Sequence, residues 1–314
     1  MNSRVHPKYK AKYRVQNWAA YDRGLVMRGS ITVWLTPEAA AVWKPRPTGK
    51  PGGQPRYSDL AIETALTLRL VFHLPLRQTE GFLCSIFKMM GIDLDVPDHT
   101  TLSRRSQSLK VALNRVAANA PIHPIIDSTG LSIVGEGEWA AAKHGGKGRR
   151  GWKKLHLGVD GSGAIVSHVL TDGSADNAKT RLEVIDVVAG EIQTITGDAA
   201  YDAMAVYDAG ACRGAKVIVP PVRTAAVPKR GRRSPFRDRT IRRVNKVGRR
   251  QWKKESGYHR QATVENAFFR YKSILGDRLR ARHPESQRTE ATLACNALNR
   301  MLDLGRPASV PVGR

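Results

Sequence analysis

The chain has few cysteines, few acidic residues and no long apolar run. Its three cysteines, Cys84, Cys212 and Cys295, are far apart and form no CxxC pair, which argues against a zinc site or a disulfide framework. We expect them to be reduced thiols in the core of a cytosolic protein. No apolar stretch reaches about 18 residues, so a membrane-spanning helix is not expected. The basic N-terminal segment lacks the apolar stretch and cleavage site of a secretion signal.

The signatures of several enzyme classes are also absent. The sequence contains no P-loop, no HExxH motif and no GxGxxG opening a helix after a strand. His156 lies in the alternating segment KKLHLGV, without an evident Ser or Cys nucleophile, so we expect a packed or half-exposed histidine on a strand. The glycine-rich segment HGGKGRRG is compatible with a phosphate-contacting loop and equally with an exposed hairpin turn.

The shortage of acids leaves a large positive charge. The chain has 52 Lys and Arg residues against 27 Asp and Glu, a formal net charge of +25. Such an excess favours a polyanionic partner, of which nucleic acid is the commonest and an anionic membrane surface the alternative. Residues 223–260 hold 15 Lys or Arg and only Asp238 and Glu255 as acids. This segment cannot bury a core by itself, so we expect a basic insertion that lies on a polyanion or is partly disordered.

At 314 residues the chain is long enough for two domains. Near Pro121 the pattern changes from helical periodicity to β-rich runs. Before it, ITVWLTPEAAAVW favours a short strand and a helix, and residues 44–56 form a Pro- and Gly-rich linker after a basic N-terminal arm. We predict an N-terminal helical domain, an α/β catalytic domain with a basic insertion, and a tail: residues 1–120, 121–305 with the insertion at about 222–256, and 306–314.

Three helices are expected between the linker and Pro121. Ser58 should cap the first, Gly91 should end the second, and the third should run through DHTTLSRRSQSLKVALNRV. Arg104 and Arg105 lie in the first turns of this third helix. The arrangement indicates a helix-turn-helix-like module with a DNA recognition helix, although any three-helix bundle would give the same pattern.

The second half of the chain alternates strands and helices. In order, we expect strands in IHPIIDSTGLSIV, GWKKLHLGVD and GAIVSHVLTD, a helix over 177–189, a strand in TITG, a helix over 202–213 and a strand in KVIVPP. Three consecutive strands followed by alternating helix and strand predict a mixed sheet in an α/β domain.

Two aspartates end apolar strands of this sheet. Asp127 follows HPII and Asp198 follows TITG, while Glu265 lies on a later helix. Three converging carboxylates repel one another unless cations lie among them, and oxygen ligands suit two Mg²⁺ or Mn²⁺ ions. One ion could activate the attacking oxygen and the other could stabilise a leaving 3′ oxygen in phosphoryl transfer. Five other acids compete with these three for the role. We interpret Asp160 and Asp172 as turn residues and Asp202 as a helix cap, and we leave the roles of Glu136 and Asp176 open.

The helix of Glu265 carries further polar residues. Tyr258, Glu265 and Lys272 recur every seven residues, so an α-helix would present them on one face, with Gln261 joining them. This face could hold a metal ion and a phosphate together, or be a solvated surface. Trp252, in RRQWKK, could stack on an unpaired base or cover the edge of the domain.

The chain resembles bacterial insertion-sequence transposases with a DDE active site, in the group (insertion-sequence family five) that has a Tyr-Arg-Glu-Lys signature. The matching segments are YDRGLVMRGSITVWL, DSTGLSIVGEGEW, WKKLHLGVD, GDAAYD and YHRQATVENAFFRYK. The resemblance implies an RNase H-like catalytic fold and metal-dependent cutting and joining of DNA at element ends. It also implies a catalytic and metal-binding triad of Asp127, Asp198 and Glu265.

The same resemblance implies further partners and roles. Lys272 and Arg260 would clamp a phosphate, and Tyr258 would pack against sugar or backbone. The signature has Arg where this chain has Gln261, so either Arg260 replaces it or phosphate binding is weaker here.

The implied partner is double-stranded DNA, both element ends and target, bound by a homodimer. The implied location is the bacterial cytoplasm, on the nucleoid and away from membranes. A stand-alone metal-dependent nuclease and an inactive or repressor-like DNA-binding relative remain alternatives.

Overall fold

The computed structural model describes residues 13–47, 49, 51–114, 121–135, 151–174, 177–228, 230–231 and 234–312. Its α-helices are α1 (Trp18–Met27), α2 (Ile31–Trp34), α3 (Pro37–Ala41), α4 (Asp59–Val71), α5 (Leu76–Met90), α6 (His99–Ser108), α8 (Asn177–Asp186), α9 (Met204–Cys212), α10 (Pro235–Val247), α11 (Arg249–Ser256), α12 (Ala262–Arg270) and α13 (Pro284–Leu304). Its strands are β1 (Tyr13–Val15), β2 (Ile125–Ile133), β3 (Trp152–Val159), β4 (Ile165–Asp172), β5 (Thr194–Gly197), β6 (Lys216–Ile218), β7 (Arg278–Leu279) and β8 (Ser309–Pro311). Two 3₁₀ turns, η2 (Ala199–Tyr201) and η3 (Tyr258–Gln261), and one π-helical turn, η4 (Tyr271–Leu275), complete it.

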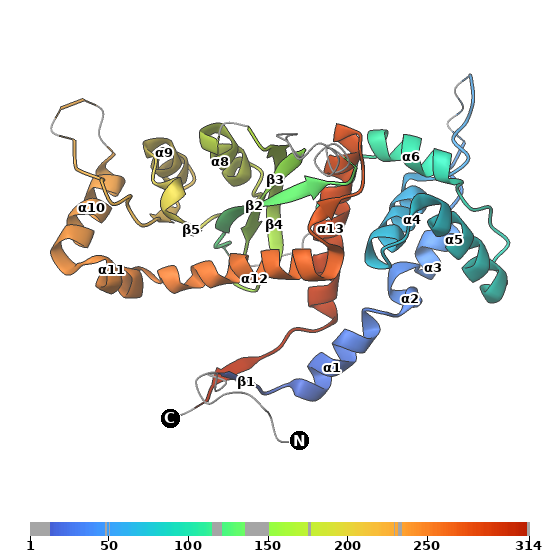
Figure 1. Cartoon of the computed structure of the whole chain (residues 1–314), viewed down its shortest axis with the longest axis horizontal. Coiled ribbons are helices and arrows are strands. Elements are labelled where there is room, and N and C mark those ends of the chain that lie inside the picture. Colours follow the sequence, from blue (N-terminus) through green and yellow to red (C-terminus); the bar gives the residue numbers. More distant parts are fainter. Residues whose placement is uncertain are drawn as a thin grey trace, which may run out of the picture.

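A mixed sheet forms the centre of the second half of the chain (Figure 1). Its strand order is β4-β3-β2-β5-β6, and β7 pairs with the far end of β2. The first three strands form an antiparallel meander, whereas β2, β5 and β6 run parallel. The mixed α/β sheet predicted from the sequence is therefore confirmed.

Alternate residues of β2 face two different cores. Ile125 belongs to a core shared with α12 and α13, and Ile126 belongs to one shared with α8 and α9. In Figure 1, α8 and α9 lie on one side of the sheet and α12 on the other. Because both faces are covered, β2 is an apolar run at its start, and its polar residues begin only at Asp127.

The N-terminal helices pack against α13, inside the same core that reaches the sheet. The Ser58 hydroxyl accepts from the backbone N–H of Ala61 and caps α4, as predicted. Gly91 ends α5 in the left-handed conformation, also as predicted. Asp98 caps α6 through the N–H groups of Thr100 and Thr101.

The third predicted helix is shorter than expected. It ends at Ser108, and Leu109 is already extended. Asn296 of α13 accepts from the N–H of Asn114 at 2.7 Å and donates to the carbonyl of Ala112 at 2.9 Å. These backbone groups bond to α13 side chains, which a continued helix would not allow.

The strand predicted at ITVWL is also wrong, because residues 31–34 form a helical turn. Val33, Trp34 and Leu35 are consecutive and all buried. A strand would expose at least one of three neighbours on its opposite face, whereas a single turn followed by a bend can bury all three.

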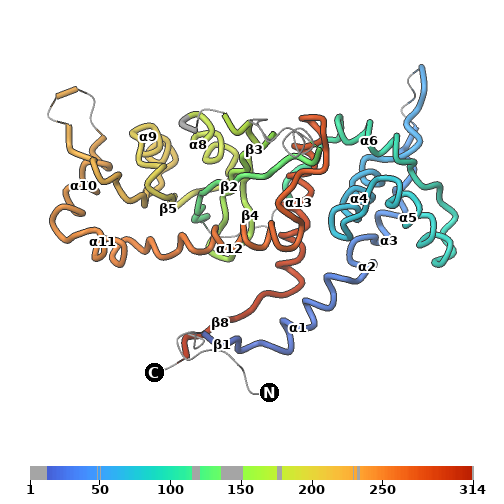
Figure 2. The backbone as a smooth tube through the Cα atoms, in the orientation of Figure 1, coloured from blue at the N-terminus to red at the C-terminus, as the bar shows by residue number. Residues whose placement is uncertain are grey.

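The two ends of the described chain lie side by side (Figure 2). Strands β1 and β8 form an antiparallel pair in which Tyr13 is opposite Pro311 and Val15 opposite Ser309. The Asn17 side chain reinforces the pairing through the N–H of Ala308 and the carbonyl of Arg306. Part of the predicted basic arm and part of the predicted tail are thus paired with each other.

The described residues of the basic insertion include two helices, α10 and α11, at the edge of the molecule farthest from the N-terminal helices. Residues 235–247 and 249–256 are therefore helical, and the expectation of partial disorder does not hold for them. Each helix buries one side chain or two, such as Ile241 and Trp252, and exposes most of its cations.

The cysteine prediction holds in part. All three thiols are free, but only Cys295 is buried, whereas Cys84 and Cys212 are exposed. Among the described residues, no helix is both long and apolar enough to cross a membrane.

Candidate active site

Two of the predicted acids lie side by side on neighbouring strands. Asp198 directly follows the last residue of β5, as expected, whereas Asp127 does not end its strand, because β2 continues to Ile133. In the parallel pair β2–β5, Ile126 is the register partner of Gly197. Asp127 and Asp198 are the next residues of the two strands, and adjacent strands lie about 4.8 Å apart. The Asp127 carboxylate accepts the N–H of Ser128 at 2.7 Å, and Asp198 accepts the N–H of Ala200 at 3.0 Å.

Glu265 reaches the same region from α12, which packs on β2 and β3. The Gln261 side chain, which is 6% exposed, lies one turn earlier, and its Nε2 donates to the carbonyl of Ile126 at 3.4 Å. Ile126 immediately precedes Asp127, so this bond holds the start of the Glu265 helix next to the part of β2 that contains Asp127. The charges of Asp198 and Glu265 both act on the Asp127 carboxyl, so the three acids that the sequence singled out lie in one region of the structure.

The electrostatics of Asp127 reflect this arrangement. Burial raises the pKa of Asp127 above its ordinary value, and the negative charges of Asp198 and Glu265 add to the rise. The bond from the Ser128 N–H acts in the opposite direction. Charges of the same acids also act on the pKa of two tyrosines. Burial raises the pKa of Tyr201 and of Tyr258, and Asp127 and Asp198 raise both further.

The three carboxylates suit divalent cations by their chemistry. Carboxylate oxygens whose negative charges repel one another are stabilised when a hard cation such as Mg²⁺ or Mn²⁺ binds between them. Across the part of the chain that the structure describes, no three His, Cys, Asp or Glu side chains are gathered tightly enough to hold an ion as they stand. Donor type thus fits the predicted ions, while the side chains are not arranged as a closed cage.

Comparison with known protein families supports this site. A family model described as a transposase DDE domain matches residues 119–300, more than half of the chain, and includes all three acids. A second model with the same description matches residues 26–136. The chain belongs to the DDE-domain transposases. Members of this family process nucleic acids. The net charge of +25 on this transposase is opposite in sign to that of nucleic acid.

The backbone around Glu265 differs from the single α-helix that the seven-residue spacing predicted. Tyr258 and Gln261 lie on the 3₁₀ turn η3, Glu265 on α12, and Lys272 on the π-helical turn η4. These segments have different residues per turn, so the face cannot be extrapolated from one helix. Glu265 and Lys272 are both exposed, and Arg260 is exposed on η3.

Three of the predicted DNA-contacting side chains are engaged inside the transposase. Gln261 is buried and bonds to the carbonyl of Ile126, and the direct DNA contact predicted for it stays a prediction. Trp252 is 6% exposed and lies against the Tyr258 ring at 6.2 Å between centroids, which supports the alternative of a covering tryptophan and leaves little ring face for a base. Arg105 donates to the carbonyl of Tyr57 at 3.1 Å and pairs with Asp59, whereas Arg104 is exposed.

Asp202 has a larger role than the helix cap predicted for it. Ala203, not Asp202, precedes α9. The Asp202 carboxylate is fully buried and accepts two bonds from Arg237 of α10, at 2.7 and 2.9 Å, and one from the N–H of Val222 at 2.8 Å. This ion pair joins the basic insertion to the turn that carries Asp198. No local pattern pointed to it, because Asp202 and Arg237 are distant in the sequence.

Tyr201 is a second residue that the sequence reasoning missed. Its ring packs over Gly197, where a Cβ atom would lie 3.0 Å from the ring. Gly197 therefore allows a buried aromatic ring directly beneath the Asp198 turn. The glycine before an acid at a strand end is the signal that could have indicated this packing.

The other candidate residues are explained by local structure. Asp160 accepts the N–H groups of Ser162 and Ala164 and is a turn residue, as predicted. Asp172 ends β4 and pairs with Lys153. His156 is buried, as one alternative predicted, and burial lowers its pKa to about 4. Glu136, Asp176 and nearly all of the glycine-rich segment lie outside the described residues.

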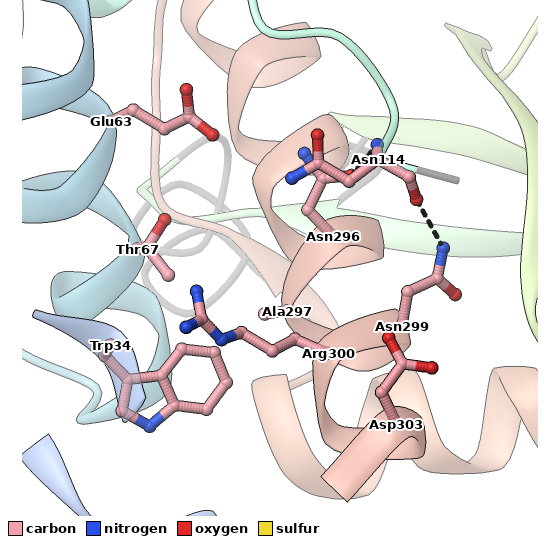
Figure 3. Close-up of a pocket in the computed structure, with 9 residues that line it drawn as sticks. All are labelled: Trp34, Glu63, Thr67, Asn114, Asn296, Ala297, Asn299, Arg300 and Asp303. Carbon is pink, nitrogen blue, oxygen red and sulfur yellow. Dashed lines mark hydrogen bonds between the residues drawn. The ribbon is translucent and has the colours of Figure 1, made fainter. Parts of the chain in front are cut away.

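A hollow of about 460 Å³ lies elsewhere, between the N-terminal helices and α13 (Figure 3). Arg300 lies over the Trp34 ring there, 5.8 Å from its centroid. Asn299 donates to the carbonyls of Asn114 and Ile165 and so ties two segments to α13. None of the three acids lines this hollow, and its asparagines serve to hold the N-terminal part against the rest of the chain.

Replacing Asp127 with Asn should stabilise the transposase at neutral pH in a metal-free buffer. The folded protein raises the pKa of Asp127, so ionising this carboxyl costs folding free energy above the raised pKa. The benefit of the neutral amide should therefore be largest near pH 7 and vanish as the pH falls towards the ordinary value of 3.8. Thermal midpoints measured across pH with a chelator present would show it.

The control for this measurement is Asp186→Asn at the exposed end of α8. It should not raise the midpoint at neutral pH. A midpoint of Asp127→Asn below that of the wild type at pH 7 would contradict the assignment of an unfavourable carboxylate at this position.

Proposed function

We propose that this transposase cuts DNA at the ends of a mobile element and joins those ends to target DNA, using divalent metal ions. The observation that carries the proposal is the register of β2 and β5, which places Asp127 beside Asp198, with the Glu265 segment bonded to the same strand through Gln261. The mixed sheet and the family support an RNase H-like catalytic fold for this region.

Each acid has a distinct place in the proposed mechanism. Asp127, on the central strand, would contact both ions, and Asp198 and Glu265 would each contact one. When bound, Mg²⁺ or Mn²⁺ would activate the attacking oxygen and stabilise the leaving 3′ oxygen. Burial and the charges of Asp198 and Glu265 disfavour the ionised form of Asp127 and raise its pKa, and a bound cation would offset that cost. Lys272 and Arg260, exposed on either side of Glu265, would bind phosphates of the strand.

The remaining surfaces would hold DNA. Helices α10 and α11 carry exposed cations with few acids among them and would bind phosphates irrespective of sequence. Helices α4, α5 and α6 would form the module that binds the terminal inverted repeat, with exposed Arg104 facing the DNA. We further propose a homodimer on DNA, because two element ends must be handled together, in the bacterial cytoplasm on the nucleoid.

The test uses labelled element-end DNA, Mg²⁺ and a target plasmid. The proposal expects cut ends and joined products that disappear when the metal is chelated. Fragments without joined products would indicate a stand-alone nuclease. A shifted band without cleavage would indicate an inactive or repressor-like DNA-binding protein, the alternative that Gln261 in the Arg position of the signature raises.

Removing two insertion cations should flatten the salt dependence of DNA binding. In the variant Arg242→Ala/Lys246→Ala, two exposed cations of α10 are lost. Each neutralised phosphate contributes roughly 0.9 to the slope of log K against log salt, so the slope should fall by about two. Gel-shift titrations at several salt concentrations measure it.

A matched double variant, Lys179→Ala/Lys216→Ala, removes two exposed cations from α8 and β6. Its slope should equal that of the wild type. An unchanged slope in the α10 variant would remove the proposed role of the insertion.

A further inference from the structure

We propose that Lys253 binds a phosphate of the DNA strand that is cut or joined, beside the three acids. This inference rests on the proposed function and deepens it, because it names a substrate-binding cation in the region of the active site. Lys253 is not one of the residues of the Tyr-Arg-Glu-Lys signature. Only the folded structure shows that it lies near the acids.

The side chain is placed by two aromatic neighbours. Lys253 Nζ lies over the Tyr258 ring, 4.7 Å from its centroid. Trp252, next to it on α11, is buried against the same tyrosine. Gly257, with φ of 75°, turns the chain between α11 and η3 so that the last turn of α11 lies back on Tyr258. Lys253 is thus held by a cation–π contact, with its stem on a packed surface.

Tyr258 lies close to the acid-bearing part of the sheet. The turn η3, which begins with Tyr258, contacts both β2, which contains Asp127, and β5, which Asp198 directly follows. Burial raises the pKa of Tyr258, and the charges of Asp198, Asp127 and Glu265 raise it further. A cation over this ring therefore lies near the acids, where a scissile phosphate would bind.

The charge of Lys253 is available for a ligand. Glu255, the nearest acid in the sequence, accepts bonds from Arg243 and Gln251. Within the described part of the chain, no carboxylate lies within ion-pair distance of Lys253. The alternative polar group near the acids, Gln261, is buried and bonded to the carbonyl of Ile126. A phosphate approaching three carboxylates needs compensating positive charge, and Lys253 can supply it through a charge-assisted hydrogen bond.

The experiment compares Lys253→Met, Lys253→Arg and Lys216→Met in the cutting and joining assay at saturating DNA and Mg²⁺. Methionine keeps an unbranched stem against Tyr258 and removes only the charge. We expect Lys253→Met to lower the rate of joining roughly tenfold, with an unchanged thermal midpoint. Lys253→Arg should retain most of the rate. Lys216→Met, which removes an exposed cation at the start of β6, outside the proposed DNA-binding surfaces, should match the wild type.

Two results would overturn the inference while the proposed function stands. One is equal joining by Lys253→Met and Lys216→Met. The other is a rate loss that accompanies a lowered thermal midpoint and is not restored by Lys253→Arg, which would indicate packing alone. If the wild-type chain neither cuts nor joins, the proposed function fails and the inference fails with it.

Discussion

Asp127→Asn is expected to lower DNA cutting and joining by at least about 10³-fold while leaving DNA binding intact. The amide has nearly the shape of the carboxylate and can still accept the N–H of Ser128. It cannot supply the negative charge that would hold divalent ions between Asp198 and Glu265. Binding should persist because it relies on surface cations far more than on this half-buried carboxylate. The measurement is the yield of cut and joined products beside a gel shift of the same samples.

The matched control for this result is Asp160→Asn. Asp160 also accepts backbone N–H groups, but it lies in the β3–β4 turn. Its amide variant should cut and join like the wild type. A variant of Asp127 that still joins ends would show that the site is assigned to the wrong residues.

Asp202→Ala is expected to destabilise the protein by about 3–5 kcal/mol, because it leaves the Arg237 guanidinium without its partner. The Asp202 side chain is fully buried and that of Arg237 is 14% exposed, so water can replace little of what is lost. The hydrogen bond to Asp202 raises the pKa of Arg237, which therefore stays charged. Denaturant unfolding of the variant and the wild type measures the difference in free energy of unfolding.

The interaction energy between Asp202 and Arg237 follows from a double-mutant cycle that adds Arg237→Met and the combined variant. The combined variant should cost less than the sum of the two single changes, since neither charge is then left buried alone. Asp186→Ala, on an exposed position of α8, serves as the control and should change stability by less than about 0.5 kcal/mol. Additive costs in the cycle would show that the two side chains act independently.

Much of the candidate site could be predicted because its signals are local. A strand buried on both faces is an apolar run, and the first acid after it marks the end of the buried part. This applies to Asp127, which follows the buried Ile125 and Ile126 within β2, and to Asp198, which follows β5. Helix ends are local too, so Ser58 and Gly91 predicted where α4 begins and α5 ends.

Other features depend on partners far away in the sequence. The predicted third helix stops at Ser108 because Asn296, on the last helix, bonds to the backbone of Asn114. The inward position of Gln261 depends on the carbonyl of Ile126, and that of Trp252 on the packing of α11 against η3. A periodicity argument assumes one regular helix and cannot foresee such competition for hydrogen bonds.

The sequence by itself determined the mixed sheet, the order of the three acids and the excess of positive charge. Each of these follows from burial periodicity or composition, which need no knowledge of distant contacts. Only the tertiary structure decided that Asp202 binds Arg237, that Lys253 lies over Tyr258 and that β1 pairs with β8. Those contacts join segments whose separate patterns are compatible with many partners. Chain folding selects one, because buried polar groups must find hydrogen-bond partners that are simultaneously within reach.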